Sequence, residues 1–173
     1  YFQNDEVVAF ATANEAIKAY DSGRCDAYTT DQSGLYSERV KLMNADEHLV
    51  LPEVISKEPL GPAVRQGDDQ WFNLVKWSHF VMLNAEELGV TKANADERLK
   101  STNPEIRRLL GVEGDFGKAL GLTPDWGFRI VKHVGNYGES FNRNLGEGSP
   151  LKIKRGLNAL WNKGGLQYAP PVR

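Results

Sequence analysis

Residues Gly23–Val40 read GRCDAYTTDQSGLYSERV, and this stretch decides the predicted fold. Its first part, Cys25–Thr30, has the pattern of a short strand, and its last part continues into a helical pattern over Ser33–Met43. A single carboxylate, Asp31, stands between the two elements. A strand that leads directly into a helix is typical of proteins with a parallel sheet covered by helices.

The residues before this stretch complete a strand–helix–strand unit. Glu6–Phe10 (EVVAF) is predicted as an apolar strand and Ala13–Ser22 as a helix, with Gly23 where a helix end favours a left-handed residue. Two strands joined by a helix pair in parallel, so this part is predicted to be α/β. A third strand is predicted at His48–Val54, where Pro52 suits an edge position.

A segment with prolines and glycine, Ile55–Pro62, follows, and we interpret it as a crossover between two lobes. One short strand, Ala63–Gln66, precedes a long helix, Asp69–Leu88, which is apolar around most of its circumference and is expected to be deeply packed. The rest is predicted as helical, with a last helix at Leu151–Trp161. Three strands before the crossover and one after it do not make two sheets. The pattern therefore predicts the C-terminal part of a larger, two-lobed α/β protein.

The composition excludes several classes of function. Lys and Arg total 21 and Asp and Glu 23, a net charge of −2 that gives no electrostatic basis for binding nucleic acid or a membrane surface. One cysteine and three isolated histidines predict no metal site and no cofactor. No arrangement of Ser, His, Asp or Cys indicates a nucleophile, so no catalytic residue is predicted. The first residues, YFQ, either match the end of a cleavage tag or are native.

Asp31 is the strongest candidate for a binding residue. Ligands of open α/β sheets bind at the carboxyl ends of the strands, and the free amides at a helix N-terminus favour negative charge. A carboxylate placed there can hold a positively charged group. Aspartate is also a preferred N-cap residue of an ordinary helix, and the residue pattern alone leaves both roles open.

Three segments carry a resemblance to a known family: Gly23–Val40, Val50–Phe72 (VLPEVISKEPLGPAVRQGDDQWF) and Val134–Arg173 (VGNYGESFNRNLGEGSPLKIKRGLNALWNKGGLQYAPPVR). They closely resemble the periplasmic solute-binding proteins of polar amino-acid ABC transporters. The most similar members are the general L-amino-acid-binding proteins of Gram-negative bacteria. The resemblance extends from Glu6 to Arg173, nearly the whole chain.

The resemblance implies a fold and a division of the chain. The fold would be the two-lobed periplasmic-binding-protein (type 2) fold, with a helix-rich C-terminal half, in a truncated form. Residues 1–57 would be the C-terminal half of lobe two. Residues 58–173 would be the crossover and the C-terminal part of lobe one. The segments that grip the ligand carboxylate with an arginine would lie outside this chain.

The resemblance also implies a function that is not enzymatic. The protein would capture L-amino acids in the periplasm and deliver them to the permease of an ABC transporter in the inner membrane. Asp31 would pair with the α-ammonium group of the ligand, and the adjacent Thr30 and Gln32 are candidates for further hydrogen bonds. The alternatives are a dehydratase-like enzyme or a ligand-sensing domain on the same fold. An enzyme would need a second acid or base facing Asp31.

Segments outside this chain are expected to matter for Cys25 and for association. Some similar proteins carry a second cysteine on the neighbouring strand, so Cys25 is expected to form a disulfide there; the alternative is a buried apolar cysteine. Lobes that lack strands leave unpaired sheet edges, which recruit other strands. The 173-residue chain is therefore expected to self-associate as a dimer.

A small basic cluster lies near the end of the sequence: Lys152, Lys154, Arg155 and Lys163. Charged residues spaced in this way usually form a solvated face, and that is the interpretation we favour. The alternative is a contact with the transporter.

Overall fold

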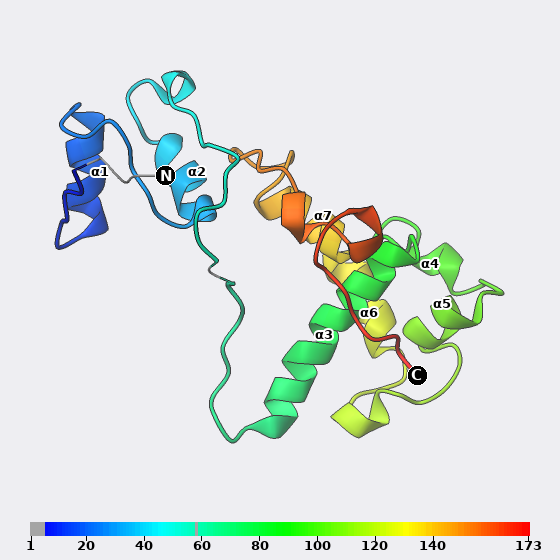
Figure 1. Cartoon of the computed structure of the whole chain (residues 1–173). Coiled ribbons are helices and arrows are strands. Elements are labelled where there is room, and N and C mark those ends of the chain that lie inside the picture. The colour runs from blue at the N-terminus through cyan, green and yellow to red at the C-terminus, as the bar shows by residue number, and fades with distance from the viewer. Residues whose placement is uncertain (1–5, 58) are drawn as a thin grey trace. The chain divides into compact units, whose positions relative to one another are not determined.

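The computed structural model describes residues 6–57 and 59–173. The chain divides between Gly61 and Pro62 into two compact units (Figure 1). Across these residues, none of the helices has both the length and the apolar character that crossing a bilayer requires.

Short helices form the first unit. They are α1 (Ala13–Asp21), α2 (Gln32–Arg39) and the 3-10 helix η1 (Ala45–Glu47). α1 begins at a complete capping box, in which the Thr12 hydroxyl accepts from the Glu15 N–H (3.3 Å) and the Glu15 carboxylate accepts from the Thr12 N–H (3.2 Å). The helix predicted at Ala13–Ser22 is confirmed, and the one predicted at Ser33–Met43 is present but shorter.

The strand predictions are wrong for this chain. The segments Glu6–Phe10, Cys25–Thr30, His48–Val54 and Ala63–Gln66 are irregular, and over the described residues the only β-type pairing is an isolated parallel bridge between Leu160 and Gln167. A strand forms only against a partner that accepts and donates its backbone hydrogen bonds, and these segments have no such partner within the described ranges. The α/β expectation is therefore not met by the structure of this chain taken alone.

The apolar residues of the predicted strands are exposed accordingly. Val7 is 83% exposed, Leu49 78% and Leu51 63%. A completed sheet would bury such side chains on at least one face.

Helices also make up the second unit. They are α3 (Asp69–Glu87), α4 (Ala95–Arg98), α5 (Pro104–Leu109), η2 (Lys118–Leu120), α6 (Trp126–Val134), α7 (Tyr137–Asn144), η3 (Gly156–Asn158) and η4 (Trp161–Lys163). The long helix predicted at Asp69–Leu88 is confirmed, and it begins where the Asp68 carboxylate accepts from the Trp71 N–H (3.0 Å). Four residues in its C-terminal half are buried, namely Val81, Leu83, Asn84 and Ala85. By contrast, Trp71 and Phe72 in its first turn are each about half exposed. The expectation of deep packing therefore holds for only part of this helix.

The helix predicted at Leu151–Trp161 is wrong. Lys152 and Gly156 have positive backbone φ angles of 50° and 48°, which a right-handed helix cannot contain. The segment instead forms a loop with two single 3-10 turns, η3 and η4.

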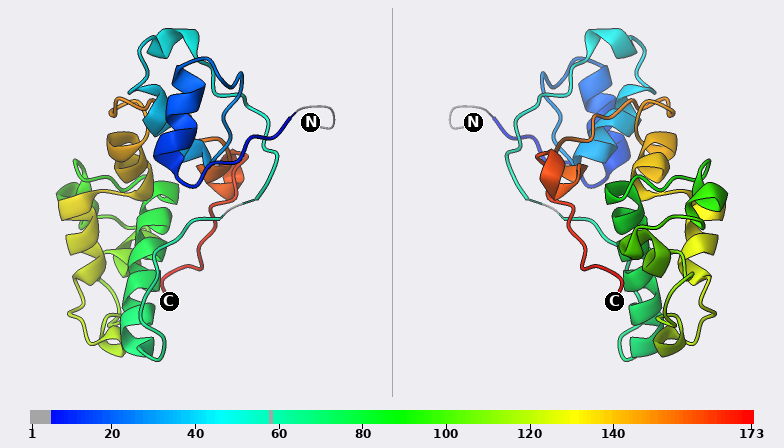
Figure 2. Two further views of the ribbon diagram at one scale, coloured as in Figure 1. Left: turned by 90° about the vertical axis from the view of Figure 1, so that its left-hand side faces the viewer. Right: turned by 90° about the vertical axis from the view of Figure 1, so that its right-hand side faces the viewer.

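The core of the second unit lies between α3, α5 and α6. α6 runs beside α3 (Figure 2), and their buried residues Val81 and Val131 meet Leu109 from α5 in one apolar cluster. Gly127 permits the close approach of α6 to α5, because a Cβ atom there would lie 2.1 Å from the Leu109 carbonyl oxygen. The backbones of α5 and α6 can therefore lie in direct contact.

The last residues of the sequence complete this core. Val172 is 7% exposed and belongs to the same apolar cluster. The Asn84 side-chain amide donates to the Pro170 carbonyl (2.8 Å), which fixes the final segment against α3. By contrast, Ala19 is the one hydrophobic residue of the described first unit that is buried.

This contrast predicts unequal stability of the two units. In the 173-residue chain, amide protons of α3 and α6 should exchange with solvent roughly hundredfold or more slowly than those of α1 and α2, because local stability follows buried apolar contacts. Hydrogen exchange read by mass spectrometry in dilute solution measures this. Equal protection of α1 and α3 would contradict the prediction.

Candidate functional site

Asp31 occupies the N-cap position of α2, but its side chain does not cap the helix. Its backbone carbonyl accepts from the Leu35 N–H (2.8 Å), whereas its carboxylate makes no cap hydrogen bond. The N-cap side chains Thr12 of α1 and Asn136 of α7 both complete capping boxes. Among the described residues, no side chain forms an ion pair or hydrogen bond with the Asp31 carboxylate, so the carboxylate remains available for another partner.

Thr30 and Gln32 lie on either side of Asp31 in the sequence, and both are exposed. Thr30 lies over the first turn of α2, where a Cβ atom at Gly34 would be 3.2 Å from its Cγ2 atom. Gln32 is the first residue of the helix. The three predicted site residues thus lie together at the start of α2 because they are consecutive in the sequence. Their role in binding a ligand stays a prediction.

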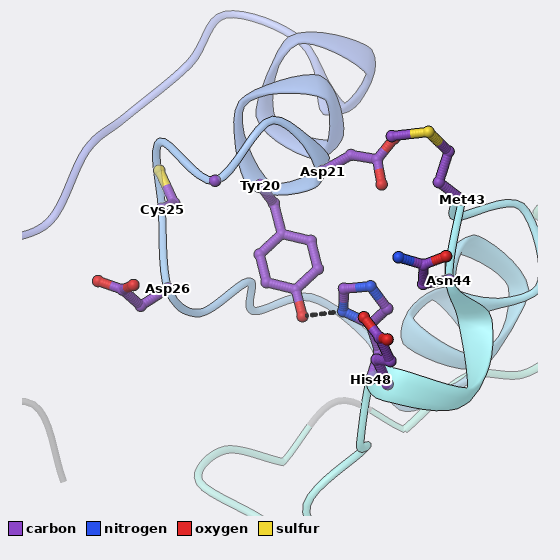
Figure 3. Close-up of a pocket in the computed structure, with 9 residues that line it drawn as sticks. Tyr20, Asp21, Cys25, Asp26, Met43, Asn44 and His48 are labelled. Carbon is purple, nitrogen blue, oxygen red and sulfur yellow. Dashed lines mark hydrogen bonds between the residues drawn. The ribbon is translucent and has the colours of Figure 1, made fainter.

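The first unit also has an open pocket of about 300 Å³, which does not include Asp31 (Figure 3). The Tyr20 hydroxyl points to the His48 ring and is hydrogen-bonded to Nδ1 (2.7 Å), which ties the end of α1 to the segment after η1. Carboxylates from Asp21, Asp26 and Glu47 line the same pocket. Within the parts of the chain that the structure covers, no group of three or more His, Cys, Asp or Glu side chains could hold a metal ion.

Cys25 lies beside this pocket, half-buried and not in a disulfide. The sequence contains no second cysteine. The predicted pairing with a cysteine outside this chain therefore stays a prediction.

Arg155 corrects the prediction of a solvated basic cluster. Its guanidinium donates to both carboxylate oxygens of Glu86 in α3 (3.2 and 3.1 Å) and to the Asn158 carbonyl (2.8 Å). It also lies over the rings of Tyr137 and Phe141, with 5.1 and 5.2 Å between its Cζ atom and the ring centroids. The pair is largely buried, with 21% of the Arg155 side chain and 12% of the Glu86 side chain exposed.

This arrangement makes Arg155 a structural residue that anchors the loop after α7. The other members of the predicted cluster are exposed: Lys152, Lys154 and Lys163. Burial raises the pKa of the Tyr137 hydroxyl next to the ion pair; Arg155 acts against this shift and Glu86 adds to it. One signal in the sequence could have indicated the pair, namely the acidic residue Glu86 near the end of a helix that is otherwise apolar on most sides.

Comparison with known structures defines the class of protein. The chain matches an ABC transporter periplasmic binding protein from Brucella ovis, solved with glutathione bound, with a TM-score of 0.88 and 62% sequence identity. The match covers 96% of this chain and 52% of that protein. The chain is therefore related to the periplasmic binding proteins, as the resemblance implied. No protein-family model matches it.

The sequence relatives are named as amino-acid-binding proteins, and one of them as part of an ABC transporter. The chain is 63% identical over its whole length to the general L-amino acid-binding periplasmic protein AapJ of Rhizobium johnstonii. It is 58% identical to the putative amino-acid ABC transporter-binding protein YhdW of Escherichia coli, and 53% identical to the glutamate/glutamine/aspartate/asparagine-binding protein BztA of Rhodobacter capsulatus, each over 96% of the chain. These relatives are named as binding proteins and not as enzymes.

The chain spans about half the length of these relatives: 52% of AapJ and 49% of YhdW and BztA. This coverage is consistent with the predicted portion of a longer protein. It also means that half of each relative has no counterpart in the structure described here.

The Glu86–Arg155 pair leads to a stability prediction. Replacing Glu86 with Gln removes the charge opposite a largely buried guanidinium, which should destabilise the second unit by about 1–3 kcal/mol. The exposed pair of Arg107 and Glu113 provides the matched control, and Glu113→Gln should change stability by no more than about 0.5 kcal/mol. Urea unfolding followed by tryptophan fluorescence measures both. Equal losses of stability in the two variants would show that the buried pair contributes no more to the free energy of unfolding than the exposed pair.

Proposed function

We propose that this chain is part of a periplasmic substrate-binding protein that captures L-amino acids and delivers them to the permease of an ABC transporter. The observation that carries this proposal is the 63% identity to a general L-amino acid-binding periplasmic protein over the entire chain. The periplasmic location and the permease partner follow from the same relationship. The proposed action is binding without chemical conversion of the ligand.

We further propose that the two units belong to the two lobes of a type 2 periplasmic-binding-protein fold. Residues 1–57 would form the C-terminal half of lobe two, and residues 58–173 the crossover and the C-terminal part of lobe one. The exposed apolar residues of the predicted strands support this assignment, since a sheet contributed by the remaining half would cover them. Trp71 and Phe72 on α3 support it for the second unit.

In this proposal, Asp31 receives the α-ammonium group of the ligand. The uncommitted carboxylate at the start of α2 supports this role, because a capping aspartate would use its oxygens on the helix amides. Thr30 and Gln32 would add hydrogen bonds from positions next to it. Residues outside this chain would hold the α-carboxylate, and closure of the two lobes would exclude water from the charge pair.

The ligands named for the relatives share one charged group that Asp31 could bind. The names of the relatives include general L-amino acids and the set glutamate, glutamine, aspartate and asparagine, and the structural relative contains glutathione. An α-ammonium group on an L-amino acid unit is common to all of these compounds, and glutathione carries it on its γ-glutamyl residue. L-Glutamate and glutathione are therefore the ligands with which to test Asp31.

Asp31→Ala in a protein that contains both lobes should weaken L-glutamate binding sharply. Removing one partner of a desolvated charge pair costs on the order of 3–5 kcal/mol, which corresponds to an affinity loss of roughly several hundred-fold or more. Isothermal titration calorimetry measures the loss. Asp46→Ala, which removes an exposed carboxylate from η1, serves as the control and should bind normally. Near-normal affinity of Asp31→Ala for L-glutamate would contradict the proposed contact between Asp31 and the α-ammonium group.

The 173-residue chain alone should self-associate, most simply as a two-fold dimer. Large apolar residues are exposed on both units, including Leu49 (78%) and Val54 (66%) in the first and Leu166 (72%) and Trp71 (51%) in the second. Exposed apolar surface and unpaired strand segments recruit a second copy. Light scattering in dilute solution tests this expectation. A stable monomer that binds amino acids with micromolar affinity would contradict both the dimer and the proposed need for the other half.

A further inference from the structure

The loop that carries η4 presents large apolar side chains to solvent at the C-terminal end of α3. The indole Nε1 of Trp161 donates to the carboxylate of Glu87, the last residue of α3 (3.3 Å), and this contact places the loop there. The exposed fractions range from 51% for Trp161 to 72% for Leu166. We call this region the η4 surface and define it by four apolar residues and one lysine: Leu157, Trp161, Leu166, Tyr168 and Lys163.

Backbone hydrogen bonds hold the apolar residues of the η4 surface close together. The Leu166 N–H donates to the Leu157 carbonyl (2.9 Å), and the Trp161 N–H donates to the Gln167 carbonyl (2.9 Å). The rings of Trp161 and Tyr168 meet edge to face, with 5.9 Å between their centroids. The exposed aromatic side chains are therefore fixed in position rather than free to reorient.

Buried neighbours anchor this loop from beneath. Leu160 is 1% exposed, and with Ala169 it packs in one apolar cluster with Leu83 of α3. Gly165 lets the backbone close on itself, because a Cβ atom there would lie 1.8 Å from the Ala159 carbonyl oxygen. Association through such a preorganised loop immobilises few additional groups, and rigid Trp and Tyr side chains are the ones that contribute most to protein interfaces.

This part of the chain is basic, whereas the rest is acidic. Residues 148–173 contain five of the 21 Lys and Arg residues and none of the 23 Asp and Glu residues. Arg155 is used by its pair with Glu86, but Lys152, Lys154 and Lys163 are exposed. Exposed aromatic side chains next to lysines fit a protein partner that presents carboxylates around an apolar patch.

The η4 surface is separate from the exposed first turn of α3, which we assign to contact with the remaining half of the protein. Trp71 and Glu87 are 16 positions apart in one helix, which at 1.5 Å per residue places them about 24 Å apart along the axis. Two carboxylates, Asp68 and Asp69, precede Trp71, whereas a lysine follows Trp161. The two surfaces therefore lie at opposite ends of α3 and differ in charge.

We propose that the η4 surface docks onto an acidic surface of a partner protein, and that this partner is the permease of the ABC transporter. The inference rests on the proposed function, in which the permease receives the amino acid. Trp161 and Tyr168 supply the apolar contact, and Lys163 pairs with carboxylates of the permease. Docking and amino-acid affinity should therefore respond separately to substitutions in the η4 surface.

The test measures L-glutamate uptake by proteoliposomes that hold the permease and its ATPase, at increasing concentrations of a binding protein that contains both lobes. Trp161→Ala and Lys163→Glu should each raise the concentration for half-maximal uptake on the order of tenfold. Their affinity for L-glutamate in calorimetry should stay within about twofold, because additivity holds for distant sites. Lys118→Glu, which reverses an exposed lysine of η2, is the matched control and should change neither quantity. Normal half-maximal concentrations in both variants would overturn the inference.

Three other outcomes would also overturn it, because each assigns the η4 surface to a different occupant. If the remaining half of the protein covers this surface, Trp161→Ala lowers the melting temperature but leaves uptake per folded molecule unchanged. If a second copy covers it, light scattering shows a dimer of the two-lobed protein that Lys163→Glu dissociates. If lipid covers it, the protein binds vesicles of phosphatidylglycerol and phosphatidylcholine that lack the transporter. Failure of the proposed function is distinguishable, since the unaltered protein would then bind no L-glutamate and support no uptake.

Discussion

α3 must bury apolar side chains on several sides, and the second unit is arranged around that requirement. α5, α6 and α7 pack against it, and Val172 of the final segment joins the same apolar cluster. Burial of this kind is the main favourable contribution to folding. The packed elements do not cover the first turn of α3, where Trp71 and Phe72 stay about half exposed.

The helices could be predicted from the sequence and the strands could not, for a physical reason. A helix satisfies its backbone hydrogen bonds within the segment, so a cap such as Thr12 or Asp68 and an apolar period are enough to place it. A strand depends on a partner that is distant in the sequence. The segment Cys25–Thr30 has strand character, but no described residue pairs with it. The helix predicted after Leu151 failed because the pattern does not reveal the left-handed conformation of Lys152.

Asp31 and Arg155 also differ in how much of their surroundings comes from nearby sequence. Asp31 could be singled out as a candidate from its place before a predicted helix, and the structure adds that α2 does not use its carboxylate, while its role as a ligand stays a prediction. The pattern around Arg155 does not show that it is paired, because its partner Glu86 lies 69 residues earlier in the sequence. A surface cluster and a buried ion pair have the same one-dimensional pattern. What distinguishes them is the presence of Tyr137, Phe141 and α3 around the guanidinium.

The distance along the chain between Glu86 and Arg155 has a consequence for folding kinetics. Closing a long loop costs entropy before the contact is gained, so contacts of high sequence separation tend to form after the local helices. The contact of Asn84 with Pro170 spans 86 residues and belongs to the same group. Interactions that form after the transition state slow unfolding while leaving the folding rate nearly unchanged. We therefore expect the contacts of the segment that follows α7 to slow the unfolding of the second unit more than they speed its folding.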